Sequence, residues 1–218
     1  MKKLWIFDLD GTIIDTLESI ANSCNHILDE YGYNAIEIEE YKYFLGNGAE
    51  FLMKSVFDRR GIPMDKFDEI YSAYLAYYKE NPTGNAKPFE GIKDFILKLK
   101  KMGIKRVVLS NKPHEAAVKV VSELFGEESF DIIIGDRDDL KRKPDPEALD
   151  LILNKLKIKV GDAFMVGDTE VDIRTGKNAD VDTIAVTWGF RTYEELKAEK
   201  PCHIVDKVKD MNKFIEGD

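Results

Sequence analysis

The sequence contains little cysteine and little histidine. Among its 218 residues, two are cysteine and three are histidine. Cys24 and Cys202 lie far apart and form no metal-type spacing, so we expect two reduced, structural thiols rather than a disulfide framework. His26, His114 and His203 are scattered along the chain, which favours structural or surface positions for all three.

Long apolar runs are also absent. No run could span a bilayer, and the apolar stretch after Met1-Lys2-Lys3 is too short for a signal peptide, so we expect a cytoplasmic protein. Positive charge is in the minority: 32 Lys and Arg face 41 Asp and Glu, for a net charge of −9. Long-range electrostatics therefore disfavour nucleic acid and membrane surfaces as partners. The sequence leaves monomer and homodimer both open.

The first dozen residues combine a buried strand with carboxylates. Leu4-Trp5-Ile6-Phe7 is a short apolar run typical of a strand buried on both faces. Asp8 and Asp10 follow where the extended chain stops, and Gly11 permits a sharp reversal. Two neighbouring carboxylates repel unless a cation joins them, and Mg²⁺ prefers such oxygen ligands. The same residues also describe an ordinary surface turn.

Helices are expected next. Apolar residues recur at helical intervals from Asp15 to Gly32, and Asp15 and Glu18 have capping-box spacing. Further helical segments are expected over 38–45, 49–59 and 65–79. Tyr71, Tyr74, Tyr77 and Tyr78 fit a bundle core or helix surface better than a stacking platform. The linker 81–85 then breaks the helical pattern.

Beyond the linker, helices and strands alternate. Strands are expected over 106–109, 131–134, 163–166 and 183–186, with a short one around Ile204. Helices are expected over 92–102, 114–125 and 146–156, after Glu170, near Glu194 and at the end of the chain. Alternation of this kind predicts an α/β fold, a doubly wound parallel sheet with a small helical insert. We assign residues 1–15 and 84–218 to the sheet domain and residues 16–83 to the insert.

Polar residues follow four of the predicted strands. In chain order they are Asp8 and Asp10; Ser110, Asn111 and Lys112; Lys141, Arg142 and Lys143; and Asp168 and Asp172. Each group alone has a plain structural explanation: a turn, a helix cap, a solvated charge run, and a charge in the first turn of a helix. Ligands of such sheets bind beyond the carboxyl ends of the strands, where all four groups are expected to meet.

Phosphoryl transfer is the chemistry that best fits these groups. A metal held by Asp8 and Asp168, with Asp172 as a further candidate ligand, would neutralise phosphate oxygens. Lys143 and Ser110 would bind the remaining oxygens. Asp8 ends the strand and is placed to attack phosphorus, while Asp10 in the turn can move a proton.

Four ordered motifs resemble those of the haloacid-dehalogenase-like phosphatase superfamily. They are Asp8-Leu9-Asp10-Gly11-Thr12, Ser110-Asn111, Lys143-Pro144, and Gly167-Asp168 with Asp172. The likeness covers essentially the whole chain, and the helical insert resembles the small cap domain of the phosphoglycolate-phosphatase-like branch. Leu45 to Glu50, Ser110 to Pro113 and Trp188 to Phe190 also look like that branch.

The resemblance implies a Rossmann-like core, a closing cap and a role for each matched residue. Asp8 would be nucleophile and metal ligand; Asp10 general acid and base, with its carbonyl on Mg²⁺; Ser110 and Lys143 phosphate ligands; Asp168 a metal ligand; Asp172 a ligand, directly or through water. Asn111 and the loop Gly46-Asn47-Gly48 are expected to bind substrate. The implied activity is Mg²⁺-dependent hydrolysis of a small phosphorylated metabolite. Phosphoglycolate is the one that the branch suggests; sugar phosphates, nucleotides and pyrophosphate stay open.

Four other functions compete. The dehalogenases lack the second aspartate, so Asp10 argues against dehalogenation. A phosphosugar mutase of the beta-phosphoglucomutase type would use the same core but retain a bisphosphate. A phospho-receiver domain fits poorly with the helical insert. A non-catalytic phosphometabolite-binding module ranks low because every position that a catalyst requires has a competent residue.

Overall fold

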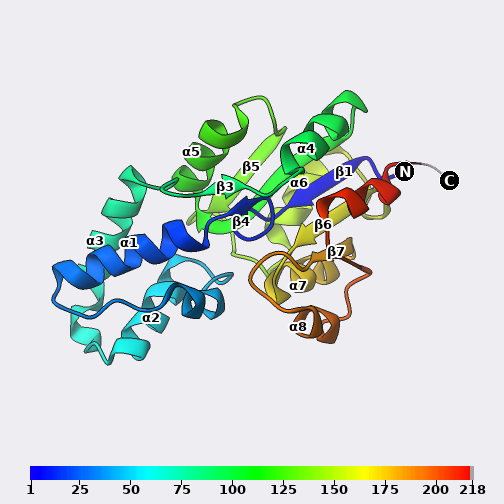
Figure 1. The fold of residues 1–218 in the computed structure, drawn as a ribbon. Coiled ribbons are helices and arrows are strands. Elements are labelled where there is room, and N and C mark those ends of the chain that lie inside the picture. The colour runs from blue at the N-terminus through cyan, green and yellow to red at the C-terminus, as the bar shows by residue number, and fades with distance from the viewer. Residues whose placement is uncertain (217–218) are drawn as a thin grey trace.

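The fold is a six-stranded parallel sheet with helices on both faces (Figure 1). It is taken from a computed structural model that describes residues 1–216. The strand order is β5-β4-β1-β6-β7-β8. The strands are β1 Leu4–Phe7, β4 Lys105–Pro113, β5 Ile132–Asp136, β6 Ala163–Gly167, β7 Asp182–Val186 and β8 His203–Val205. The predicted doubly wound α/β sheet is confirmed.

Strand β1 lies inside the sheet and pairs in parallel with both β4 and β6. All four of its side chains are fully buried. Trp5 and Phe7 join the apolar cluster on one face, whereas Leu4 and Ile6 join the cluster on the other. This explains why the segment is an unbroken apolar run instead of an alternating one.

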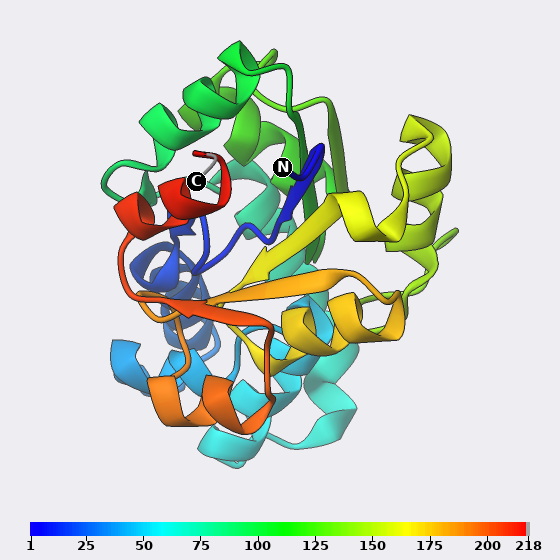
Figure 2. The same cartoon turned by 90° about the vertical axis from the view of Figure 1, so that its right-hand side faces the viewer.

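Helices cover the two faces of this sheet (Figure 2). The helices are α4 Ile92–Lys101, α5 His114–Phe125, α6 Glu147–Leu156, α7 Glu170–Asn178 and α8 Tyr193–Ala198, with short 3₁₀-helices η3 Val160–Asp162 and η4 Val208–Phe214. Helices α4, α5 and η4 pack on the face that carries Trp5, and α6 packs on the face that carries Leu4. None of the helices among residues 1–216 has a stretch long and apolar enough to cross a membrane.

A second group of helices lies beyond one end of the sheet (Figure 1). These cap helices are α1 Leu17–Glu30, η1 Ile38–Tyr43, α2 Ala49–Arg60, η2 Met64–Lys66 and α3 Phe67–Glu80. They share a separate apolar cluster, which Ala116 and Phe190 from the sheet side also join. The antiparallel pair β2 Ile14–Asp15 and β3 Lys87–Pro88 stands where the chain leaves and returns. The boundaries of the insert at 16–83 stay a prediction.

Several local predictions need correction. Thr16, not Asp15, is the N-cap of α1, and no side-chain capping bond forms there. Asp15 instead pairs with Lys87 in the β2–β3 ladder, and this tertiary pairing overrides the capping pattern. The segment expected as a helix over 38–45 is the 3₁₀-helix η1. Both cysteines are free, but Cys202 is exposed, unlike the buried Cys24.

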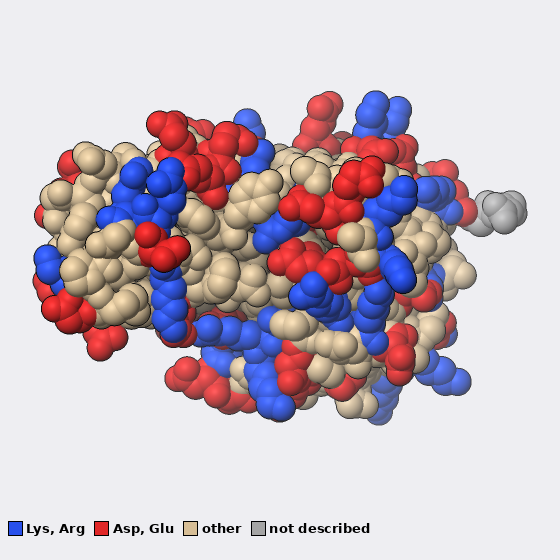
Figure 3. All heavy atoms as spheres, turned by 90° about the horizontal axis from the view of Figure 1, so that it is seen from below, with Lys and Arg blue, Asp and Glu red and all other residues tan. Residues whose placement is uncertain are grey.

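The surface charges are mixed. On the face shown in Figure 3, acidic and basic side chains alternate over much of the molecule. The excess negative charge therefore does not form one continuous field on this face, and the electrostatics that matter for an anionic ligand are local.

Candidate active site

Three carboxylates and one ammonium group meet at the carboxyl end of the sheet. One carboxylate oxygen from each of Asp8, Asp168 and Asp172 lies within 4.8 Å of the other two. Lys143 Nζ donates a hydrogen bond of 2.6 Å to Asp172 Oδ1 and lies 2.8 Å from Asp8 Oδ1. All four residues are buried. Strands β1 and β6, helix α7 and the loop after β5 thus bring together residues that the sequence places far apart.

The charges of this cluster do not balance. Burial, reinforced by Asp172, raises the pKa of Asp8 to about 7. Burial and the neighbouring carboxylates also raise the pKa of Asp168 well above its usual value. Burial opposes the charge of Lys143, but Asp172 and Asp8 outweigh it and raise the pKa of that ammonium. One buried ammonium cannot neutralise three carboxylates, so the cluster favours an additional cation.

The donor atoms of the cluster fit a hard divalent cation. The contact of Lys143 Nζ with the buried Asp8 Oδ1 uses only part of the acceptor capacity of this carboxylate, which can still bind a cation. An all-oxygen set of carboxylate ligands is what Mg²⁺ and similar hard ions bind.

A hydroxyl group and a backbone N–H group orient the Asp168 carboxylate. Its Oδ1 accepts a hydrogen bond of 2.7 Å from Thr12 Oγ1, and its Oδ2 accepts one of 2.8 Å from Phe190 N. The chain approaches this carboxylate closely at Gly11, where φ is +84° and a Cβ atom would lie 2.3 Å from Asp168 Oδ2. Only glycine satisfies both demands at this position.

Asp172 has a structural task as well as its contact with Lys143. Its Oδ2 accepts hydrogen bonds from Thr169 N at 3.1 Å and from Thr169 Oγ1 at 2.8 Å, which closes the capping box of α7. The structure shows the helix-start role of this residue, and its role as a metal ligand stays a prediction.

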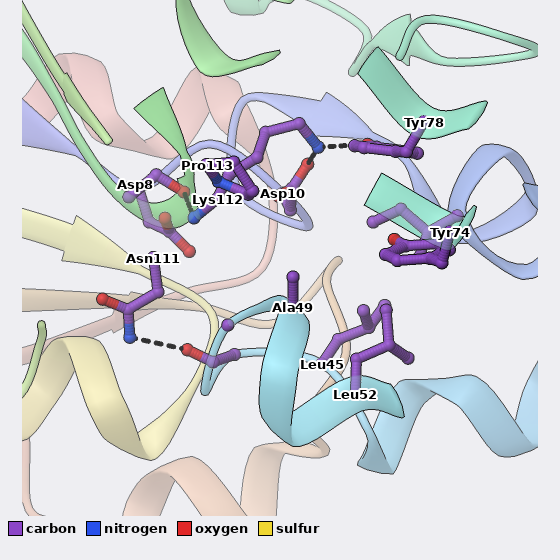
Figure 4. A pocket seen from close by; sticks show the side chains of 14 residues that line it. Asp8, Asp10, Leu45, Ala49, Leu52, Tyr74, Tyr78, Asn111, Lys112 and Pro113 are labelled. Atoms are coloured by element: carbon purple, nitrogen blue, oxygen red, sulfur yellow. Dashed lines mark hydrogen bonds and ion pairs between the residues drawn. The ribbon is translucent and has the colours of Figure 1, made fainter. Parts of the chain in front are cut away.

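Asp10 lines a pocket beside this cluster and has its own cation. Lys112 Nζ pairs with Asp10 Oδ1 at 2.8 Å and also contacts the Tyr78 hydroxyl (Figure 4). The Lys112 side chain is only 2% exposed. Burial raises the pKa of Tyr78 to about 12, so that phenol stays protonated. From the sequence, Lys112 is only a polar residue at a strand end without a role; its position directly after Ser110-Asn111 was the available signal.

The pocket lies between the sheet edge and the cap helices (Figure 4). Its polar wall includes Asp8, Asp10, Ser110 and Lys112. Its apolar wall comes from the cap: Ile20, Leu45, Ala49, Leu52, Tyr74 and Tyr78. Its free volume is about 40 Å³, enough for a few water molecules. Tyr74 and Tyr78 belong to the cap core, as predicted, and also line this pocket.

The remaining predicted site residues lie at or near this pocket. Ser110 lines it, and its Oγ accepts a hydrogen bond from Lys112 N. Gly46 and Gly48 line it too, whereas the half-buried Asn47 is not among the lining residues. Direct contact of these residues with substrate stays a prediction.

Asn111 uses its amide group to hold two loops together. Its Nδ2 donates hydrogen bonds of 3.0 Å to both Gly46 O and Lys143 O, and its Oδ1 accepts one of 2.9 Å from Lys143 N. The residue lies within β4, which extends to Pro113, so it is not the helix cap that the plain interpretation suggested. Its side chain links the loop at Gly46 to the backbone that positions Lys143.

Comparisons with known proteins agree on one family. The sequence profile of the haloacid dehalogenase-like hydrolase family matches residues 5–186. The chain is 32% identical to a phosphoglycolate phosphatase from Aquifex aeolicus, over 97% of this chain and 96% of that one. It is 33% identical to pyrophosphatase PpaX from Bacillus velezensis, over 94% and 93% of the two chains.

A solved structure extends the likeness to three dimensions. It is of a protein from Lactobacillus delbrueckii subsp. bulgaricus, provisionally assigned as a phosphoglycolate phosphatase. The two chains superpose with a TM-score of 0.91 at 30% identity, over the full length of both. The likeness therefore includes the cap helices as well as the sheet.

Proposed function

The chain belongs to the haloacid dehalogenase-like hydrolase family and is one of its phosphatases, and we propose that it hydrolyses a small phosphorylated metabolite with the help of Mg²⁺. The observation that carries this proposal is the position of Lys143 between Asp8 and Asp172, beside Asp168. A nucleophile, a phosphate-binding cation and carboxylate ligands for a metal then share one buried site.

The residues divide the reaction between them. Asp8 and Asp168, with Asp172 and the Asp10 carbonyl as further ligands, would hold Mg²⁺, which supplies positive charge against the phosphate oxygens. Lys143 and Ser110 bind the same phosphoryl group through N–H and O–H donors. They thereby reduce the repulsion that an approaching carboxylate meets.

Hydrolysis then proceeds in two transfers. A carboxylate oxygen of Asp8 attacks phosphorus and forms an aspartyl-phosphate, while Asp10 gives its proton to the departing oxygen. Asp10 next takes a proton from water as the water oxygen attacks phosphorus. The P–O bond to Asp8 breaks, phosphate leaves, and both aspartates return to their starting states.

The pocket favours a small leaving group with negative charge. The free volume of the pocket is small. The ammonium of Lys112 lies beside Asp10, close to where the oxygen of the leaving group would be. Phosphoglycolate and pyrophosphate, the compounds in the relatives' names, both have anionic leaving groups. We propose a substrate of this kind; a phosphosugar mutase, which would retain a bisphosphate, stays the alternative. A cytoplasmic location and the choice between monomer and homodimer stay predictions.

A substrate panel with one inactive variant tests the proposal. Wild-type protein and Asp8→Asn are assayed with Mg²⁺ on phosphoglycolate, pyrophosphate, p-nitrophenyl phosphate and a hexose 1-phosphate. Released phosphate is measured, and isomerisation is scored for the hexose. We expect phosphate release that disappears in Asp8→Asn and in excess chelator. Full activity in that variant or in chelator would remove the mechanism, and isomerisation without release would replace it by a mutase.

A further inference from the structure

The segment Trp188 to Arg191 connects the carboxylate cluster to the cap. Trp188 Nε1 donates a hydrogen bond of 3.0 Å to Thr12 O, in the turn that follows the nucleophile strand. Phe190 N donates to Asp168 Oδ2, while the Phe190 side chain packs into the cluster of the cap helices. Phe190 thus contacts Asp168 with its backbone and the cap helices with its side chain.

Arg191 ends this segment and is almost entirely buried. Its Nη1 donates a hydrogen bond of 2.5 Å to Lys42 O, and its Nη2 donates one of 3.1 Å to Leu45 O. Its Nε is 2.9 Å from Glu170 Oε2, and this ion pair compensates the buried charge. Both carbonyl acceptors belong to residues 42–48, which we call the cap loop.

The cap loop supplies Leu45, Gly46 and Gly48 to the pocket wall. Arg191 holds it on one side, and Asn111 holds it on the other through Gly46 O. All three acceptors are backbone carbonyl oxygens, so these hydrogen bonds do not depend on the side chains of the cap loop. A guanidinium can serve two carbonyls and one carboxylate together because its N–H groups form a rigid planar fork, which an ammonium lacks.

We propose that Arg191 is a positioning residue that holds the cap loop over the pocket and thereby makes the enzyme selective for small phosphate esters. Arg191 does not line the pocket itself, so it acts through the loop. The inference rests on the proposed phosphatase function. Without Arg191, two of the three carbonyls lose their donors, and the wall that restricts the leaving group is no longer held.

The chain offers a matched control for this arginine. Arg174 forms a comparable two-pronged pair with Glu199, with Nε 3.0 Å from Oε2 and Nη2 2.5 Å from Oε1. Arg174 and Glu170, the partner of Arg191, both lie on α7. The Arg174 side chain is 53% exposed and donates to no residue of the cap loop.

The experiment compares Arg191→Ala, Arg191→Lys and Arg174→Ala on two probes, phosphoglycolate and p-nitrophenyl phosphate. For Arg191→Ala we expect kcat/KM for phosphoglycolate, relative to that for the aryl ester, to fall about tenfold, which is ~1.4 kcal/mol of discrimination. Arg191→Lys keeps the positive charge but not the planar guanidinium, so the ratio of the two kcat/KM values should fall by less than in Arg191→Ala. Arg174→Ala should keep the wild-type ratio.

Amide hydrogen exchange gives a second readout that does not depend on activity. Exchange within residues 42–48 should accelerate in Arg191→Ala and stay at the wild-type rate in Arg174→Ala. An equal loss of activity on both probes with unchanged exchange would overturn the inference and leave the proposed function intact. Wild-type protein that hydrolyses neither probe would overturn the inference, and inactivity on the whole substrate panel would overturn the proposed function as well.

Discussion

Replacing Lys143 by methionine tests the electrostatics of the active site. Its ammonium lies 2.8 Å from Asp8 Oδ1 and 2.6 Å from Asp172 Oδ1, and the three side chains are 2%, 7% and 1% exposed. Methionine keeps much of the aliphatic volume and removes the charge, which leaves the buried carboxylates without an ammonium. Breaking a buried ion pair from one side costs about 3–5 kcal/mol. In a chain of this size, that lowers the melting temperature by roughly 6–20 °C.

The assay is thermal unfolding, first in excess chelator and then with saturating Mg²⁺. Mg²⁺ should restore part of the lost stability, because a bound cation supplies the positive charge that the ammonium supplied. Lys141→Met is the control, since its side chain is 71% exposed and its contact with Asp145 is 3.4 Å long. It should change the free energy of unfolding by no more than about 0.5 kcal/mol. If Lys143→Met in chelator unfolded at the temperature of this control, the argument for a charge-compensated cluster would be wrong.

Three further predictions address individual groups. Asp10→Asn should slow turnover, measured as kcat, by about 10²–10⁴-fold and leave substrate affinity in a direct binding assay largely intact. Weaker binding at unchanged turnover would contradict the acid–base role. Gly11→Ala should lower the free energy of unfolding by at least about 1–3 kcal/mol, because the added methyl group would lie 2.3 Å from Asp168 Oδ2 at a φ of +84°. Denaturant unfolding that gives wild-type stability would refute this close approach. In chelator, the raised pKa of Asp8, about 7 in the fold against about 3.9 unfolded, stabilises the fold below pH ~4, and this contribution is lost as the pH rises through ~7. Denaturant unfolding at several pH values should show this loss, and Asp8→Asn should reduce it.

Local patterns predicted most of the elements because each depends on residues close in sequence. The apolar run Leu4 to Phe7 indicated a strand buried on both faces, and β1 is such a strand. Helical periodicity placed α2 and α5 within a residue or so of their observed ends. The boundary at Asp15 was missed because a strand pairing with Lys87, distant in sequence, competed with the local capping pattern.

Side-chain partners were harder to predict than side-chain types. Asn111 is predicted to bind substrate, and this stays a prediction; its amide makes three backbone contacts that only the folded loops bring within reach. Lys112 received no role, although it is buried between Asp10 and Tyr78. A register shift between Leu109 and Pro113 interrupts regular alternation in β4, so residue order alone does not tell which way this lysine points.

The amino-acid sequence by itself determined the fold class and the sheet edge at which the carboxylates arrive, because periodicity and strand ends are properties of short segments. Only the tertiary structure decided which cation accompanies which carboxylate: Lys143 with Asp8 and Asp172, and Lys112 with Asp10. It also decided that Arg191 reaches the carbonyls of a loop almost 150 residues earlier. Such pairings depend on distances of about 3 Å between segments remote in sequence, and local propensity carries no information on those distances.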